Sequence, residues 1–207
     1  MTNFNISQID EAYQRIQSFI VKTPLIYSEY LNNITKAKVF FKLENLQRTG
    51  SFKLRGATNK IIQLTLEEKK RGVVAYSSGN HAQGIAAVAK KFSCPAIIIM
   101  PSDAPRLKIE NTKSYGAEVI LYDRSKESRE GLGISIAKNR GLTLIKPYDD
   151  EKVIAGQGTL GLELAAQLSK FSIQTADVLV CCGGGGLTAG VALALAEVAP
   201  NLKVRPC

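Results

Sequence analysis

The chain has 207 residues, of which 45% are apolar, and a formal net charge of +9. This length suits one domain or two small ones, and no apolar run approaches the roughly 20 residues that cross a bilayer. The basic balance raises nucleic-acid binding as a class, but the Lys and Arg residues are scattered and no zinc-finger or RNP-like pattern accompanies them. The polar amino terminus does not resemble a signal peptide, so we expect a cytoplasmic protein. For the reasons above, we expect neither a membrane nor a nucleic acid as its partner.

The four cysteines and the single histidine limit the zinc sites and disulfides that the chain can form. The four cysteines are Cys94, Cys181, Cys182 and Cys207, and none of them has CxxC spacing. We therefore expect neither a zinc site nor a disulfide framework. Cys181 and Cys182 end an apolar run, which predicts that both are small buried core residues.

The chain begins with a predicted amphipathic helix. Isoleucines recur at helical spacing between Ile6 and Ile20, with Ser7 as the expected N-terminal cap. Pro24 ends this segment, because the residue before a proline avoids the helical region. Residues 39–44 begin with the β-branched Val39 and the aromatic Phe40 and Phe41, and they predict a strand. This strand leads to a predicted helix from residue 52 to about 64.

Strands and helices then alternate. Strands are predicted at 73–76, 96–100, 118–122 and 142–145, and helices at 82–91, 108–115 and 128–139. A turn at 147–150 is followed by a helix at 158–168, a buried strand at 177–182, a helix at 188–199 and the start of a strand at 203. Near-continuous apolar strands that alternate with helices predict a parallel sheet covered on both faces.

Lys53 is the first candidate for chemistry. It follows a Gly-Ser turn and Phe52, and it precedes a helix-like run. A lysine amine condenses with aldehydes once it loses its proton in a desolvated pocket. A lone lysine of this kind is more often an ordinary solvated helix residue, so the interpretation depends on the two motifs that follow.

Four consecutive glycines lie between a predicted strand and a predicted helix; they are Gly183, Gly184, Gly185 and Gly186. Glycines let backbone N–H groups converge on a phosphate, and the helix N-terminus adds positive potential. A tight packed turn is the alternative, but it needs fewer glycines. A P-loop requires Lys-Ser/Thr where Leu187-Thr188 stands, and the acid of a dinucleotide site is absent about 20 residues later.

Ser77-Ser78-Gly79-Asn80-His81 lies at another strand-to-helix junction, where free N–H groups favour a carboxylate. By itself this segment is equally well a serine-capped helix start. One covalent anchor, one polar loop and one phosphate-binding loop are together what pyridoxal 5′-phosphate requires.

These motifs resemble the serine/threonine dehydratase and serine racemase family of pyridoxal-phosphate enzymes. Residues 51–57, 77–83, 155–159 and the four glycines carry the resemblance, which extends from Thr23 to the end of the chain. It implies a fold-type II α/β architecture, similar to the tryptophan synthase β subunit, with two parallel-sheet domains around the cofactor. We expect a small domain at 71–146 inserted into a larger one formed by 1–70 and 147–207. The larger domain is expected to be incomplete, because members of the family continue beyond this point.

The resemblance also implies a role for each candidate residue. Lys53 holds the cofactor as a Schiff base and acts as the catalytic base, while Phe52 lies against the cofactor ring. Ser78 corresponds to the serine that racemases use as a second acid/base. The four glycines and Leu187 hold the phosphate, Asn80 binds the ring hydroxyl, and the substrate is bound by Ser77, Ser78, Gly79, Asn80 and His81. Glu44 and Asn45 are expected to add polar contacts near the site.

We therefore predict a dehydratase (ammonia-lyase) of L-serine or L-threonine that yields a 2-oxo acid and ammonia. Many threonine dehydratases carry alanine at the place of Ser78, so this serine leaves racemisation open as a second activity. The alternatives are a catalytically inactive fragment and a cysteine-synthase-like β-replacement enzyme, whose S-V-K-D-R pattern differs from the S-F-K-L-R found here. Racemases of the family bind a divalent cation through a later segment, so no metal ligand is assigned. The expected partners are an amino-acid substrate and, at full length, a second copy in a homodimer.

Overall fold

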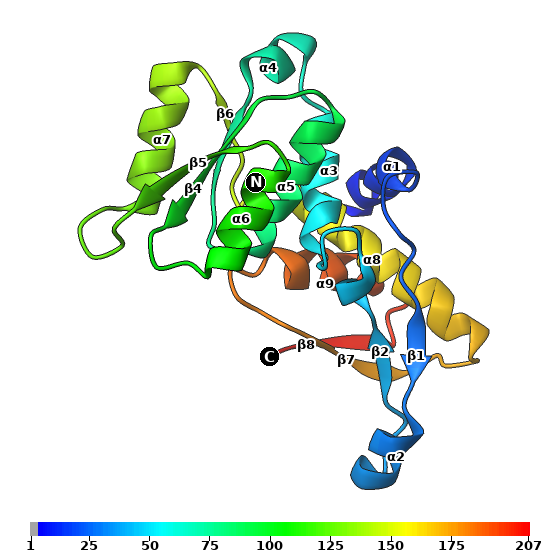
Figure 1. Ribbon diagram of the computed structural model, residues 1–207. Helices are drawn as coiled ribbons and strands as arrows, with labels where there is room; N and C mark the ends of the chain where they lie inside the picture. Colours follow the sequence, from blue (N-terminus) through cyan, green and yellow to red (C-terminus); the bar gives the residue numbers. More distant parts are fainter. Residues whose placement is uncertain (1–3) are drawn as a thin grey trace.

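The computed structural model describes residues 4–207 (Figure 1). A four-stranded sheet with its helices lies at one side of the molecule, and a group of packed helices with two short sheets lies at the other. The chain enters from the helical part, forms the four-stranded sheet and then returns to the helical part. The lysine, the polar loop and the glycines named above all lie at helix starts where these two parts meet.

The first helix, α1 (Ile6–Ile16), buries Ile9, Ala12 and Ile16. Its cap is Asn5, whose side chain accepts a hydrogen bond from the Ser7 N–H, so the prediction of Ser7 as the cap is wrong. Asparagine is as good a cap as serine, and Gln8 completes the capping box by accepting from the Asn5 N–H. The helix itself is confirmed.

A small antiparallel hairpin follows α1. It consists of β1 (Leu25–Tyr27) and β2 (Phe40–Lys42), joined through α2 (Glu29–Thr35), and Leu25 is paired with Lys42. The sequence predicted only the second strand, which ends earlier than expected because a 3₁₀ helix, η1 (Glu44–Leu46), begins there. The chain then enters α3 (Lys53–Ile62), which starts at the candidate lysine.

The central sheet is all parallel, as predicted, in the order β5-β4-β3-β6. Its strands are β3 (Val73–Tyr76), β4 (Ala96–Pro101), β5 (Glu118–Tyr122) and β6 (Thr143–Leu144), and its helices are α4 (Leu66–Arg71), α5 (Asn80–Lys91), α6 (Arg106–Ser114) and α7 (Arg129–Arg140). Side chains alternate between faces along each strand. Ala75 and Ile98 share a core with α5, whereas Val74 and Ile99 share one with α7, so both faces are covered.

The long helix α8 (Glu151–Lys170) connects the helical part because its glycines allow close backbone approach. A Cβ atom on Gly156 would lie 2.6 Å from the Gly56 Cα of α3. A Cβ atom on Gly190 of α9 (Gly186–Val198) would lie 2.7 Å from the Gly158 backbone nitrogen. Helix α8 begins seven residues before its predicted start at Gly158. The packing contacts of its glycines outweigh their low helix propensity.

The last two strands, β7 (Ala176–Val180) and β8 (Leu202–Pro206), pair in parallel with each other. The prediction of a buried strand here is wrong, because Leu179 is 73% exposed. Cys181 and Cys182 are likewise exposed rather than buried, whereas Cys94 is buried. An apolar run predicts a fully buried strand correctly only when both faces of the strand are covered. Strand β7 is covered on one face.

Candidate active site

Lys53 is the first residue of α3, and its ammonium group has a neutral partner. Its Nζ donates a hydrogen bond to the carbonyl oxygen of Pro147 at 2.6 Å and lies 5.4 Å from the centre of the Phe52 ring. Burial lowers the pKa of Lys53 to about 8, and the nearby Cys181 opposes this shift. Half of the amine is therefore neutral near pH 8, which is the form that attacks a carbonyl carbon.

The loop after β6 connects Lys53 to the glycines. Pro147 accepts from the lysine, and the next residue, Tyr148, packs directly on the glycine loop, residues 183–186. A Cβ atom on Gly184 would lie 2.2 Å from the Tyr148 ring, and one on Gly186 would lie 2.7 Å from the Tyr148 carbonyl oxygen. The sequence indicated only a turn here, because no pattern distinguishes a tyrosine that supports a loop from one on the surface.

The glycine loop has the free donors and the space that a phosphate group needs. Gly185 has φ +84° and forms the N-cap of α9, and it offers no side chain there. Cβ atoms on Gly183 and Gly185 would meet no heavy atom within 4 Å. Within residues 4–207, the N–H groups of Gly183, Gly184 and Gly185 donate to no protein acceptor. Uncovered N–H groups at a helix N-terminus fit an anion of this size, so the loop fits a phosphate-bearing cofactor.

The polar loop Ser77–His81 leads from β3 into α5. Gly79 is the N-cap of α5, and its N–H donates to Ser77 Oγ at 3.2 Å. Ser78 and Asn80 are exposed and available to a ligand. α5 also packs on the start of α3, since a Cβ atom on Gly84 would lie 3.4 Å from the Lys53 carbonyl carbon. The start of α3, where Lys53 lies, therefore packs against the helix that this loop begins.

His81 is buried beneath that loop. Its Nε2–H donates to the carbonyl oxygen of Ile145 at 3.3 Å, and burial, followed by the nearby charge of Lys53, lowers its pKa to about 3. The imidazole is therefore neutral at physiological pH, with Nε2 protonated. Its Nδ1 has no hydrogen-bond partner among residues 4–207. A side chain that is 2% exposed supports the loop from below.

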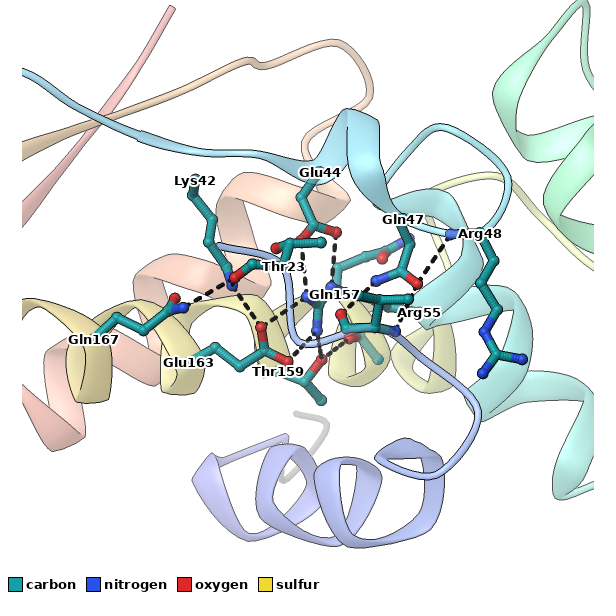
Figure 2. A network of polar contacts seen from close by, with 12 residues as sticks. Thr23, Lys42, Glu44, Gln47, Arg48, Arg55, Gln157, Thr159, Glu163 and Gln167 are labelled. Atoms are coloured by element: carbon teal, nitrogen blue, oxygen red, sulfur yellow. Dashed lines mark hydrogen bonds and ion pairs between the residues drawn. The ribbon is translucent and has the colours of Figure 1, made fainter. Parts of the chain in front are cut away.

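A largely buried network of four charged side chains surrounds Arg55, two residues further along α3 (Figure 2). Arg55 donates to both oxygens of Glu44 at 2.8 Å and to both oxygens of Glu163 at 2.9 Å. Lys42 also donates to Glu163, at 2.6 Å. The Glu44 carboxylate is therefore engaged with Arg55, and its oxygen also accepts from Thr23 at 2.6 Å. Sequence reasoning missed this network, because Arg55 and Glu163 are 108 residues apart.

The comparisons identify the class of protein that this fold and site define. The model of the pyridoxal-phosphate dependent enzyme family matches residues 16–206, and the chain belongs to this family. The fold class predicted from the sequence, fold-type II, is thereby confirmed, as is the resemblance to dehydratases and racemases.

Two curated relatives are nearly half identical to the chain. L-threonine dehydratase catabolic TdcB of Staphylococcus aureus is 48% identical over 201 residues, which are 97% of this chain and 57% of the relative. Serine racemase of Schizosaccharomyces pombe is 47% identical over 196 residues, which are 95% of this chain and 59% of the relative. The chain thus spans less than two thirds of the length of these relatives.

Solved structures of related enzymes agree with this assignment. The serine racemase of Dictyostelium discoideum has a TM-score of 0.90 and 37% identity, with 99% of this chain and 66% of that one covered. The serine racemase of maize has a TM-score of 0.92 and 39% identity, with 99% of this chain and 61% of that one covered.

Proposed function

We propose that this protein is a pyridoxal-phosphate-dependent dehydratase that converts L-serine or L-threonine to a 2-oxo acid and ammonia, with racemisation of serine as a second activity. One observation carries the proposal: Lys53, with a pKa of about 8, lies between a glycine loop with free N–H groups and a polar helix start. The names of the relatives, a threonine dehydratase and a serine racemase, support the substrate class.

Different residues of the chain would bind different parts of the cofactor. Lys53 would form the covalent link, the N–H groups from Gly183 to Leu187 would hold the phosphate, and Phe52 and Asn80 would contact the ring. When bound, pyridoxal phosphate supplies an electron sink for the substrate α-carbon. Once the substrate amine has replaced Lys53 on the cofactor, the free amine of Lys53 would be the base that takes the α-proton, because a pKa near the working pH suits proton transfer in both directions.

The polar loop would orient the substrate. The N–H groups at the start of α5 would bind the α-carboxylate, with Ser77, Gly79 and His81 contributing through the backbone or through support of the loop. Ser78 is exposed at this position and would exchange a proton with the α-carbon from the side opposite Lys53. Loss of the α-proton and the β-hydroxyl as water would leave an enamine, which takes up water to give the 2-oxo acid and ammonia. A proton returned by Ser78 would instead invert the α-carbon.

We further propose that residues 71–146 form a small domain inserted between 1–70 and 147–207. The central sheet supports this division, since its strands all lie between Val73 and Leu144. A cytoplasmic location and a homodimer complete the proposal. No helix of residues 4–207 is both long and apolar enough to cross a membrane, and those residues contain no cluster of three or more metal-ligating side chains.

The proposal is tested with the purified native protein and added cofactor. L-Serine and L-threonine should each give a 2-oxo acid and equimolar ammonia, measured by coupled assays. Conversion of O-acetylserine and sulfide to cysteine, without 2-oxo acid from serine, would favour the β-replacement alternative. A protein that binds the cofactor but reacts with none of these substrates would favour the inactive alternative.

Ser78→Ala separates the two activities. Because general acid–base groups contribute on the order of 10²- to 10⁴-fold, serine racemisation should fall by at least about 100-fold. Dehydration of L-serine should fall far less, since Lys53 alone takes the α-proton for that reaction. D-Serine formation is measured by chiral chromatography beside pyruvate formation. Equal losses of both activities would remove Ser78 from the acid/base role.

A further inference from the structure

A second lysine lies over the start of α5, from the side of α6. A Cβ atom on Gly79 would be 2.9 Å from the Nζ and 3.3 Å from the Cδ of Lys108. The side chain of Lys108 therefore lies across the polar loop, and a side chain at position 79 would displace its end. Lys108 is half-buried, and its ammonium group makes no ion pair or hydrogen bond within residues 4–207.

This position is electrostatically unfavourable for a cation that has no anion beside it. The N-terminus of a helix carries partial positive charge, so an ammonium group is repelled there. Lys53, whose backbone carbonyl packs against Gly84 of the same helix, is a second lysine beside α5. A carboxylate held at the loop would reverse the balance, since it would be attracted by the helix N-terminus and by Lys108 together.

We propose that Lys108 binds the carboxylate of the substrate at the Ser77–His81 loop, together with the N–H groups of α5. This inference rests on the proposed function and adds a recognition residue that α6 brings to the site from further along the chain. An alternative is that the aliphatic stem of Lys108 only covers Gly79 while its charge stays in water. The two alternatives differ in one result, namely whether removal of the Lys108 charge weakens the binding of carboxylate ligands alone.

Lys108→Met separates charge from packing, because methionine keeps most of the aliphatic stem over Gly79. Lys113→Met is the matched control: it removes the same charge from an exposed position on the same helix. Lys108→Arg keeps the charge and should retain most of the binding. Unchanged thermal midpoints and unchanged cofactor absorbance in all three variants verify that the fold and the cofactor site are intact.

The ligands are L-serine and ethanolamine, which is serine without its carboxylate. Binding to the cofactor-loaded native protein is followed by rapid-mixing absorbance of the cofactor before product accumulates, so the readout does not depend on product formation. Lys108→Met should weaken L-serine binding by about 10- to 100-fold, the range for a hydrogen bond to a charged group, and change ethanolamine binding by less than about twofold. In turnover, KM for L-serine should rise while kcat stays within a few-fold.

Three outcomes would overturn the inference: unchanged L-serine binding in Lys108→Met, equal losses for both ligands, or an equal loss in Lys113→Met. Failure of the proposed function gives a different result. A wild-type protein that binds L-serine but forms no 2-oxo acid would contradict the dehydratase activity, while the comparison of the two ligands still decides the role of Lys108. A wild-type protein that binds neither ligand would contradict both.

Discussion

Lys53 and Arg55 lie two residues apart at the start of α3, yet their surroundings give them opposite properties. Burial by itself lowers the pKa of a cation, but hydrogen bonds and charges from Glu44 and Glu163 overcome this for Arg55 and raise its pKa. Among residues 4–207, the ammonium group of Lys53 has a single hydrogen-bond partner, the neutral Pro147 carbonyl, so burial prevails and the pKa of Lys53 falls to about 8. One helix turn thus holds a permanently charged structural group beside an amine that can lose its proton.

The hydrogen-bond partners of the two side chains distinguish a structural cation from a reactive one. Arg55 donates to two carboxylates and to Thr159. These bonds use all the N–H donors of its guanidinium group, so no donor is left for a ligand. The network also ties β2, η1 and α8 to α3, and so it fixes the helix that presents Lys53 (Figure 2). The four charges of this network sum to zero and fix the helix in place, whereas Lys53, which has no carboxylate partner, is the residue that we propose for the chemistry.

The largest expected effect comes from breaking the Arg55 network. Glu163→Ala leaves Arg55 and Lys42 buried with one carboxylate between them, which should cost about 3–5 kcal/mol of unfolding free energy. Urea unfolding, followed by circular dichroism, measures it. Lys53→Met is the matched control, since it removes a cation two residues away that burial disfavours, so the unfolding free energy should not fall. Equal destabilisation by both variants would contradict the distinction between them.

A smaller effect is expected at the glycine loop. Gly183→Ala adds a Cβ atom that meets no protein atom and requires no positive φ, so the fold should keep its stability. A phosphate on the N–H groups would approach this Cβ closely, and cofactor affinity should fall by about tenfold, or about 1.4 kcal/mol. Gly184→Ala is less informative, because it also displaces Tyr148. Unchanged cofactor affinity in Gly183→Ala would make this loop a packing feature only.

The smallest expected effect is a shift along the pH axis. Acetylation of Lys53 by a trace of anhydride requires the neutral amine, so its rate should rise with a midpoint near pH 8, whereas an ordinary lysine titrates near about 10.4. The folded pKa lies below the unfolded one. Protonated Lys53 therefore disfavours the fold most strongly below pH 8, and this penalty disappears as pH rises toward 10.5. Mass spectrometry of the labelled peptide gives the midpoint, and a midpoint at the ordinary lysine value would contradict the desolvation of Lys53.

The features that the sequence predicted are those that depend on local pattern. β3 and β5 have the predicted bounds, because continuous apolar runs identify strands in a parallel sheet. The start of α8 was misplaced, since its glycines lower helix propensity and only the contacts with α3 and α9 explain them. The Arg55–Glu163 pair, Tyr148 on the glycine loop and Lys108 over Gly79 join residues distant in sequence, and a single sequence contains no signal for such contacts.

The central claim is that Lys53, rather than another lysine, carries the cofactor. The direct test is to load the native protein with pyridoxal phosphate, reduce it with borohydride and map the modified peptide by mass spectrometry. The account predicts a stoichiometric pyridoxyl group on Lys53, and its loss in Lys53→Met with the fold retained. A pyridoxyl group on Lys108, on Lys42 or spread over several surface lysines would contradict the account.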